Sequence, residues 1–484
     1  MLLLVTNIQR LSFNDYNNSF EPAGDALFQN AYSGTVSKMT VYNSCAEVKQ
    51  IQLKTNFLIK RCPMKPFQTT DFAALIGIDW ADRSHEICMA LPNCSTFKTD
   101  TLPHKPEAID RWAMEIKKRF PKKRIAICCE LKKGPLIYAL SKYNHLVLFP
   151  VNPQTVAKLR KAFSTSGAKD DPNDAQLQCE LLAKHMDKLS PLMPQNPKLR
   201  ALQQLVEYRR RCVSDKVQIT NRLRSALKNY FPQVLEWFAD IDTNIFCDFL
   251  TRWPTLRAAK RARKTTLFNF FQNHNARYSN INHQRIQAIK SAVTLTEDEG
   301  ILLPNQLLVQ RLIEQLRVAL NTIECFDDEI KTIFQQLTDR KLFESFPGAG
   351  VVLAPRLCAA FGEQRNRYQS ADEIAKYAGI APVLERSGKK SWVHWRYACP
   401  KFLRQTFVEW AGESVRHSFW ANAYYNQQKA KGKPHQTIIR CLAFKWIRIA
   451  FRCWQNRKPY DESTYLQALK KRNSPLLKFA AENN

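Results

Sequence analysis

The 484-residue sequence lacks long hydrophobic runs and contains little glycine. No stretch approaches the roughly 18 uninterrupted apolar residues that a membrane-spanning helix needs, and no amphipathic anchor is evident. Residues 1–5 are too short for the apolar region of a signal peptide and carry no basic residue. Only 13 residues are glycine, whereas 45% are hydrophobic. We therefore expect a soluble globular protein of the cytoplasm, with disorder confined to ends and linkers.

Acidic residues are scarce compared with basic ones. The 43 Asp and Glu residues are outnumbered by 73 Lys and Arg, which gives a formal net charge of +30. A field of this sign and size attracts polyanions. A solvated basic surface or an anionic membrane face would also explain the charge. We expect DNA as the partner, no membrane, and a nucleoid-associated location.

Cysteines with the paired spacing of a zinc site are missing as well. The 14 cysteines are scattered through apolar segments, as Cys128 and Cys179 are, and none has the spacing of a zinc site. We expect them to be reduced core residues in a reducing compartment.

The length predicts about three domains, at roughly 150 residues each. Residues 1–70 show no sustained period, so they are interpreted as a loose extension, and Met64 is a candidate start of the working protein. The further boundaries are expected at 71–192 for an α/β domain, 193–340 for a helical coiled-coil linker with a basic insertion, 341–470 for a mainly helical domain, and 471–484 for a tail.

The first domain has a characteristic order of elements. Strands are predicted at 75–79, 86–91, near Phe97, 124–130 and 145–151, with helices at 106–120, 136–143 and from Pro153 and Pro172. Three strands followed by alternating helices and strands indicate a ribonuclease-H-like fold, with helices flanking a mixed sheet.

The linker region repeats apolar residues at helical spacing. The two runs are Leu202, Val206, Val213, Ile219, Leu223 and Leu227, and Leu312, Leu316, Leu320, Ile323, Ile330 and Leu337. Two long antiparallel helices are predicted. Residues 257–264 between them are densely basic, which fits either a solvated loop or a nucleic-acid contact.

Four carboxylates are predicted to converge in the α/β domain. Asp79 and Glu130 end two predicted strands, and Asp171 and Asp174, three positions apart, share one face at the start of a helix. Clustered carboxylates repel one another unless cations compensate them, and Mg²⁺ (or Mn²⁺) prefers such oxygen ligands. The alternative for the helix pair is ordinary capping, with Asp171 as the N-cap and Asp174 as a first-turn acid.

Three motifs make the resemblance specific. Residues 76–81 (IGIDWA), 151–153 (VNP) and 169–175 (KDDPNDA) resemble the D-E-D-D domain of the insertion-sequence 110 transposase family, related to Piv invertases. The similarity extends over about residues 74–470. It implies a domain like that of the resolvase RuvC, with divalent metal bound by Asp79, Glu130, Asp171 and Asp174.

The third domain carries a candidate nucleophile. Residues 377–382 (YAGIAP) and 386–390 (RSGKK) resemble the family's C-terminal transposase domain, which supplies a serine. By position this serine is Ser387, with Ser391 and Ser370 as alternatives. A serine hydroxyl needs a nearby base, metal or cationic environment, and no base is evident locally.

Several residues of this domain are candidates for nucleic-acid contact. Residues 346–350 (FPGAG) are typical of a helix-hairpin-helix turn, in which glycine lets backbone N–H groups approach a phosphate, or of a plain helix-linking turn. The candidates are Gly348, Gly350, Arg386, Lys389, Lys390, Arg396 and Arg404.

The sequence thus predicts a transposase or site-specific recombinase in which Ser387 attacks a DNA phosphodiester with metal assistance. The resemblance implies a structured guide RNA as a further partner and a homo-oligomer, a dimer or tetramer formed through the long helices. The enzyme alternative is a metal-dependent junction resolvase that uses water. The non-enzyme alternative is a regulator that only binds nucleic acid.

Overall fold

The computed structural model describes residues 67–482, except 93, 95, 131–132, 164–170, 194, 275, 277 and 389. Met64 and most of the expected N-terminal extension lie outside the described residues. The elements below all belong to the second of the two units into which the chain divides, Pro66–Asn484. Within the described ranges, no helix is both long and apolar enough to cross a membrane.

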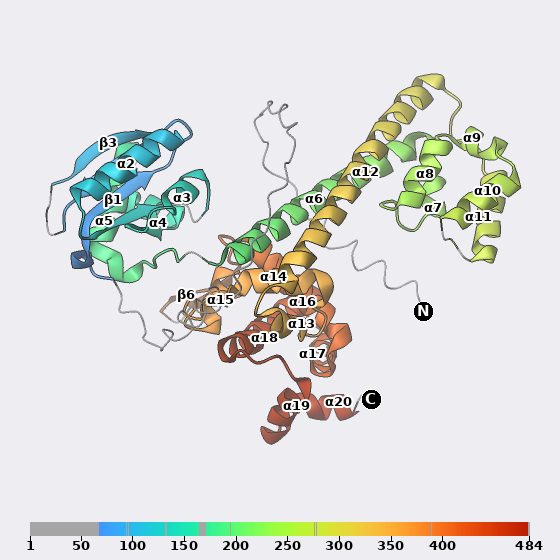
Figure 1. The fold of residues 1–484 in the computed structure, drawn as a ribbon. Coiled ribbons are helices and arrows are strands. Elements are labelled where there is room, and N and C mark those ends of the chain that lie inside the picture. Colours follow the sequence, from blue (N-terminus) through green and yellow to red (C-terminus); the bar gives the residue numbers. More distant parts are fainter. Residues whose placement is uncertain are drawn as a thin grey trace, which may run out of the picture. The chain divides into compact units, whose positions relative to one another are not determined.

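A five-stranded mixed sheet forms the centre of the α/β region (Figure 1). Its strands, in spatial order, are β3 (Lys98–Pro103), β2 (Ser84–Ala90), β1 (Phe72–Asp79), β4 (Arg124–Cys129) and β5 (Leu146–Pro150). β1 pairs antiparallel with β2 and parallel with β4, and β4 pairs parallel with β5. The predicted order of strands and the mixed sheet are confirmed.

Helices cover both faces of this sheet because its strands alternate two apolar sets. Ile76 and Ile127 belong to the core that includes α2 (Pro106–Arg119) and α3 (Pro135–Leu140). Leu75 and Cys128 face the opposite way. They pack with α4 (Pro153–Phe163) and α5 (Asp171–His185).

Two long helices follow, α6 (Pro197–Tyr230) and α12 (Glu299–Gln335). They run antiparallel, since Leu202 near the start of α6 packs in one core with Ile330, and Leu223 near its end packs in another with Leu312. An ion pair between Arg209 and Asp327 joins them, with Nη2 donating to Oδ2 at 2.8 Å. The predicted antiparallel helices are confirmed.

Five short helices lie between α6 and α12 in the sequence. They are α7 (Val234–Trp237), α8 (Asn244–Arg252), α9 (Leu256–Arg261), α10 (Lys264–Asn273) and α11 (Ser279–Ser291). An aromatic core that includes Phe238, Phe249 and Phe271 holds them against the long helices. The interpretation of residues 257–264 as a loop is wrong, because most of this segment is helical.

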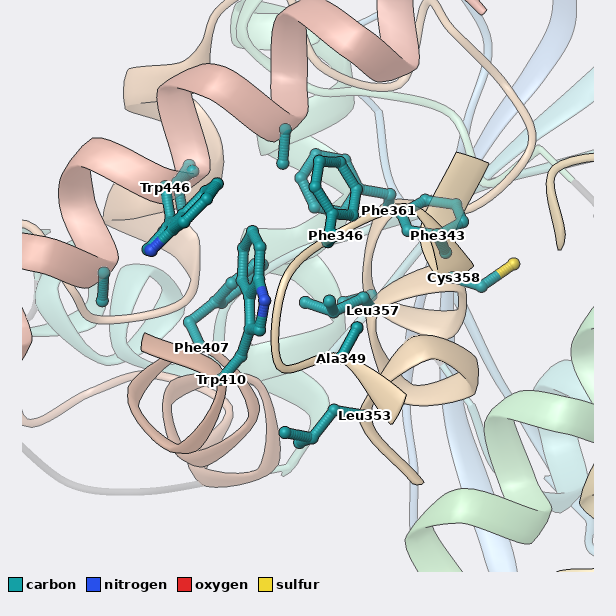
Figure 2. Close-up of a cluster of buried hydrophobic side chains, with 14 of the residues drawn as sticks. Phe343, Phe346, Ala349, Leu353, Leu357, Cys358, Phe361, Phe407, Trp410 and Trp446 are labelled. Carbon is teal, nitrogen blue, oxygen red and sulfur yellow. The ribbon is translucent and has the colours of Figure 1, made fainter. Parts of the chain in front are cut away.

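The C-terminal region is mainly helical but contains a hairpin that the sequence did not predict. Its helices are α13 (Arg340–Glu344), α14 (Gly350–Phe361), α15 (Ala371–Tyr377), α16 (Lys401–His417), α17 (Phe419–Ala430), α18 (His435–Asn456), α19 (Glu462–Lys471) and α20 (Pro475–Glu482). Figure 2 shows their core, where Phe346, Trp410 and Trp446 lie together. The hairpin consists of β6 (Val383–Ser387) and β7 (Lys390–His394).

Candidate active site

Asp79 and Glu130 lie at the ends of neighbouring parallel strands. Ile78 of β1 pairs with Cys129 of β4, so the next residue along each strand is one of the two acids. Asp79 shares its face with Leu75, and the alternation of β4 places Glu130 on the face of Cys128. By this alternation we expect both acids on the face of the sheet that α5 covers.

The helix α5 lies unusually close to β1 because the strand has a glycine at the crossing point. A Cβ atom on Gly77 would lie 2.0 Å from the carbonyl oxygen of Ala175 and 2.5 Å from the nitrogen of Cys179. The buried amide of Gln178 faces the carbonyl oxygens of Ile78 and Cys128, and with its nitrogen turned toward them it donates to both, at 2.8 Å and 2.9 Å. This helix is therefore fastened to the two strands that carry Asp79 and Glu130.

Asp174 is held by a neighbouring helix. It is 2% exposed, and the guanidinium group of Arg160 in α4 binds both of its carboxylate oxygens, with Nε 2.6 Å from Oδ1. Asp171 is the first residue of α5, but its side chain lies outside the described residues. Arg160 is a partner that the sequence analysis missed, since nothing in the pattern of α4 distinguishes it from the other basic residues there.

A metal cluster of three or more ligands is not formed by the described side chains. In that part of the chain, no group of three His, Cys, Asp or Glu residues lies close enough to hold an ion. Because the set excludes the side chain of Asp171, the convergence of the four acids stays a prediction.

A buried histidine hydrogen-bonds to the turn that follows Asp79. His85, fully buried in β2, accepts a hydrogen bond at Nδ1 from the backbone N–H of Ala81 (3.3 Å). Its Nε2 therefore carries the proton and donates to Nδ1 of His104 at 2.9 Å. Burial and, secondarily, the nearby His104 lower the pKa of His85 to about 4. The histidine is thus neutral at physiological pH.

This turn borders an open hollow of about 350 Å³ beside Asp79. Its lining residues are Asp79, Ala81, Asp82, Arg83, Ser84 and Glu86. Glu86 pairs directly with Asp79 across β1 and β2, so the two side chains lie on one face. Glu86 was not among the site residues predicted from the sequence, because the register of two strands is needed to place it beside Asp79.

Ser387 lies at the tip of the β6–β7 hairpin. It is exposed and pairs in register with Lys390, and the turn between them contains Gly388. Gly388 has φ +57°, a left-handed conformation that a two-residue hairpin turn requires and glycine adopts readily. The other turn residue, Lys389, lies outside the described residues.

The strand register decides which residues share a face with Ser387. Residues paired across a hairpin point to the same side, so Lys390 shares the Ser387 face, as do Glu385 and His394. Glu385 binds His394, with Oε2 3.2 Å from Nε2. The sequence offered no proton acceptor near the serine, whereas the hairpin places a carboxylate two residues away on the same face.

The alternative serines occupy different surroundings. Ser391 pairs with Arg386 and points to the opposite face of the hairpin from Ser387. Ser370 is the N-cap of α15, where its hydroxyl oxygen accepts a hydrogen bond from the N–H of Glu373 at 3.3 Å. Both Arg386 and Lys390 are exposed.

The two candidate glycines of the α13–α14 turn differ in their surroundings. A Cβ atom on Gly348 would lie 2.8 Å from backbone atoms of Glu413 and Ser414, so close packing against α16 requires this glycine. Gly350 is exposed, with open space where a Cβ atom would be. Gly348 thus has a packing role whether or not the turn contacts a phosphate.

The two candidate arginines after the hairpin bind the protein's own backbone. Nε of Arg396 donates to the carbonyl oxygen of Ala381 at 3.2 Å. Arg404 donates through Nη2 to the carbonyl oxygen of Tyr397 at 3.3 Å and stacks over Trp395. Both side chains therefore stabilise the backbone next to the hairpin. Their contact with nucleic acid stays a prediction.

Comparisons with known proteins match the two regions that carry these residues. Residues 76–232 match the transposase profile of the IS110 D-E-D-D type, and residues 340–426 match that of the transposase IS116/IS110/IS902 family. A mini-circle protein named as a transposase for IS117, from Streptomyces coelicolor, is 26% identical over 84% of this chain and 98% of its own length. The 44.8 kDa protein of insertion element IS116, from Streptomyces clavuligerus, is 23% identical over 79% of this chain and 95% of its own.

These matches confirm the resemblance that the motifs at residues 76–81 and 377–382 indicated. The proteins of these families are transposases, enzymes that cut and rejoin DNA. The chain belongs to the IS116/IS110/IS902 family of transposases.

Proposed function

We propose that this transposase cleaves and rejoins DNA by attack of Ser387 on a phosphodiester, assisted by a divalent cation at Asp79, Glu130, Asp171 and Asp174. The observation that carries the proposal is the placement of Asp79 and Glu130 at the ends of neighbouring parallel strands, where Ile78 pairs with Cys129. The sheet order β3-β2-β1-β4-β5 supports a ribonuclease-H-like domain, a fold in which acids at these strand ends serve nuclease chemistry.

The path of α5 supports a place for Asp171 in the same site. Cys179 lies at Leu75, where its Sγ donates to the strand's carbonyl oxygen at 3.3 Å, and Ala175 lies at Gly77. Residue numbers fall along α5 as they rise along β1, so the helix runs antiparallel to the strand. Four helical residues and two strand residues both span about 6 Å, so one turn of α5 corresponds to two residues of β1. By this spacing we expect the backbone of residue 171, one turn nearer the start of α5, to lie near the level of Asp79.

The carboxylates of Asp79 and Glu130 are suitable ligands for a hard divalent cation, whereas Asp174 must first leave its contact with Arg160. Carboxylate oxygens such as those of Asp79 and Glu130 are the ligands that Mg²⁺ and Mn²⁺ accept. Asp174 would have to exchange its contact with Arg160 for such a role. A bound cation would supply positive charge that stabilises the negative charge developing on phosphate oxygens.

The serine step exchanges one phosphoester for another. The Oγ atom of Ser387 bonds to phosphorus while one bridging P–O bond of the DNA breaks, and the departing deoxyribose oxygen takes up a proton. The serine proton passes to a base, for which Glu385 on the same face is our candidate. Lys390 places a positive charge on that face. Because no bond energy is lost to water, the reverse step can join a new strand.

We further propose that the protein works as a homo-oligomer on DNA and is directed by a structured guide RNA. The net charge of +30 supports polyanionic partners, since neutralised phosphates release bound counterions. The exposed hairpin supports a site completed by another surface, because a two-stranded hairpin exposed on both strands is marginally stable alone. RNA that co-purifies with the protein as one discrete species would support guidance, whereas random cellular RNA would contradict it.

A suicide DNA substrate tests the serine mechanism. A nicked substrate that loses a short fragment after cleavage should leave DNA covalently attached to the wild-type protein. Ser387→Ala should abolish the adduct, while Ser391→Ala should retain it. A protein that cleaves without an adduct would instead be a metal-dependent nuclease that uses water. An Asp79→Asn variant that retains full cleavage would overturn the role of the acids.

A further inference from the structure

A compact basic surface lies in the helical region between α6 and α12. The eight residues 257–264 (RAAKRARK) contain five basic residues, three alanines and no acid. They span most of α9 and the start of α10. The two family profiles match residues 76–232 and 340–426, so this surface belongs to neither matched region.

The alanines of this segment face inward and the cations face outward. Ala259 is fully buried, and Ala258 and Ala262 pack against the aromatic core of the five short helices. Arg257, Arg261, Arg263 and Lys264 are exposed. The small side chains let α9 lie close to the core, and the long basic ones are left on the surface.

Two lysines hold the end of α9 in place. The ammonium group of Lys290 in α11 donates to the carbonyl oxygens of Lys260 and Ala262, which are acceptors left open where the helix ends. Lys260 in turn donates to the carbonyl oxygen of Ala292 at 2.6 Å. The backbone that carries Arg261, Arg263 and Lys264 is therefore fixed on both sides.

The exposed cations are only weakly compensated within the protein. Arg257 lies 3.9 Å from Glu297, but both side chains are largely exposed, and such pairs contribute little. Arg261, Arg263 and Lys264 make no ion pair within 4 Å among the described residues. Solvated protein surfaces usually mix both signs of charge, whereas this one carries a single sign.

We propose that α9 and the start of α10 form an accessory DNA-binding surface that contacts the phosphate backbone of duplex DNA outside the cleavage site. The planar guanidinium groups of Arg261 and Arg263 match the geometry of phosphate oxygens. Contacts of this kind position a duplex without reading its sequence. We commit to DNA because the family cuts and rejoins DNA.

Salt-dependent binding tests this surface directly. The variant Arg261→Gln, Arg263→Gln, Lys264→Gln is compared with a matched variant of equal charge, Lys117→Gln, Lys118→Gln, Lys122→Gln, whose residues are also exposed. Both are made in a full-length Ser387→Ala protein, so binding is measured without cleavage. Binding of duplex DNA and of duplex RNA is followed by fluorescence anisotropy over a series of KCl concentrations.

The first variant should bind DNA about tenfold or more weakly at moderate salt, and its slope of log affinity against log salt should fall by about 2 to 3, since each lost phosphate contact removes about 0.9. The matched variant should change the slope by less than about one unit. Unchanged thermal unfolding and circular dichroism would show that the fold is intact. An unchanged DNA slope, equal losses in both variants, or a loss confined to RNA would each overturn the proposal.

Discussion

The guanidinium group of Arg160 binds both carboxylate oxygens of Asp174, with Nε 2.6 Å from Oδ1 and Nη2 donating to Oδ2. The side chains are 16% and 3% exposed. Asp174 is one of the four acids proposed to hold a cation, so the same carboxylate has two candidate partners. Arg160 compensates a buried negative charge that would otherwise be costly, and it releases that carboxylate only if another cation replaces it.

Arg160→Gln should therefore lower the free energy of unfolding by about 3 kcal/mol, because it leaves the buried carboxylate of Asp174 without its charged partner. Urea denaturation measures the change. The double variant Arg160→Gln, Asp174→Asn should recover most of the loss while remaining unable to cleave DNA. A double variant with wild-type cleavage would remove Asp174 from the catalytic set.

Gly77→Ala should detach α5 from the sheet. The added Cβ atom would lie 2.0 Å from one backbone atom and 2.5 Å from another, and neither atom can move without the helix. We expect a loss of at least about 3 kcal/mol in unfolding free energy, together with loss of cleavage. Gly412→Ala is the control, since no atom beyond the adjoining backbone of α16 lies within 4 Å of its added Cβ. It should stabilise the protein by about 0.5–1 kcal/mol. Equal thermal midpoints for the two variants would contradict this interpretation of the crossing.

The free energy of unfolding should decrease at acidic pH, in part because His85 becomes protonated. Its pKa of about 4 lies below the ordinary 6.5, so the neutral form is the one that the folded state favours. The stability from this group is fully present above pH 6.5 and is lost as the pH falls towards 4. The loss is up to roughly 3 kcal/mol. The unfolding free energy of wild type minus that of His85→Gln, measured from pH 7.5 to 4, should decline over this range. A constant difference would show that His85 does not titrate in this way.

Glu385→Gln should slow formation of the serine–DNA adduct by about 100-fold, because it removes the proton acceptor on the Ser387 face. The rate of adduct formation on the suicide substrate is the measurement. His394→Gln keeps the carboxylate and removes only its partner, so it should have an effect of less than about fivefold. A Glu385→Gln protein that forms the adduct at the wild-type rate would exclude the carboxylate as the base.

Sequence periodicity was sufficient to predict the strands and helices that bury one regular set of apolar residues. The strands β1 and β4 and the long helices α6 and α12 carry regular apolar residues, and the structure confirms each of them. The hairpin that carries Ser387 was missed for the opposite reason. Nearly all residues of β6 and β7 are exposed, so no alternation of buried and exposed positions marks them as strands.

The basic segment 257–264 shows how a local pattern can mislead. Its few apolar anchors fitted a solvated loop as well as a nucleic-acid contact, yet alanines pack α9 on the core and Lys290 of α11 binds the carbonyl oxygens at its end. A run of charged residues predicts which side chains are exposed to solvent. It does not predict whether the backbone of that segment is helical.

The sequence by itself determined which strands end in Asp79 and Glu130 and that the chain belongs with transposases, because strand alternation and short motifs are local properties. Only the tertiary structure decided that Arg160 binds Asp174, that Gly77 admits α5, and which side chains share a face with Ser387. These relationships join residues from different elements, and they depend on strand register and helix packing, which local periodicity does not encode.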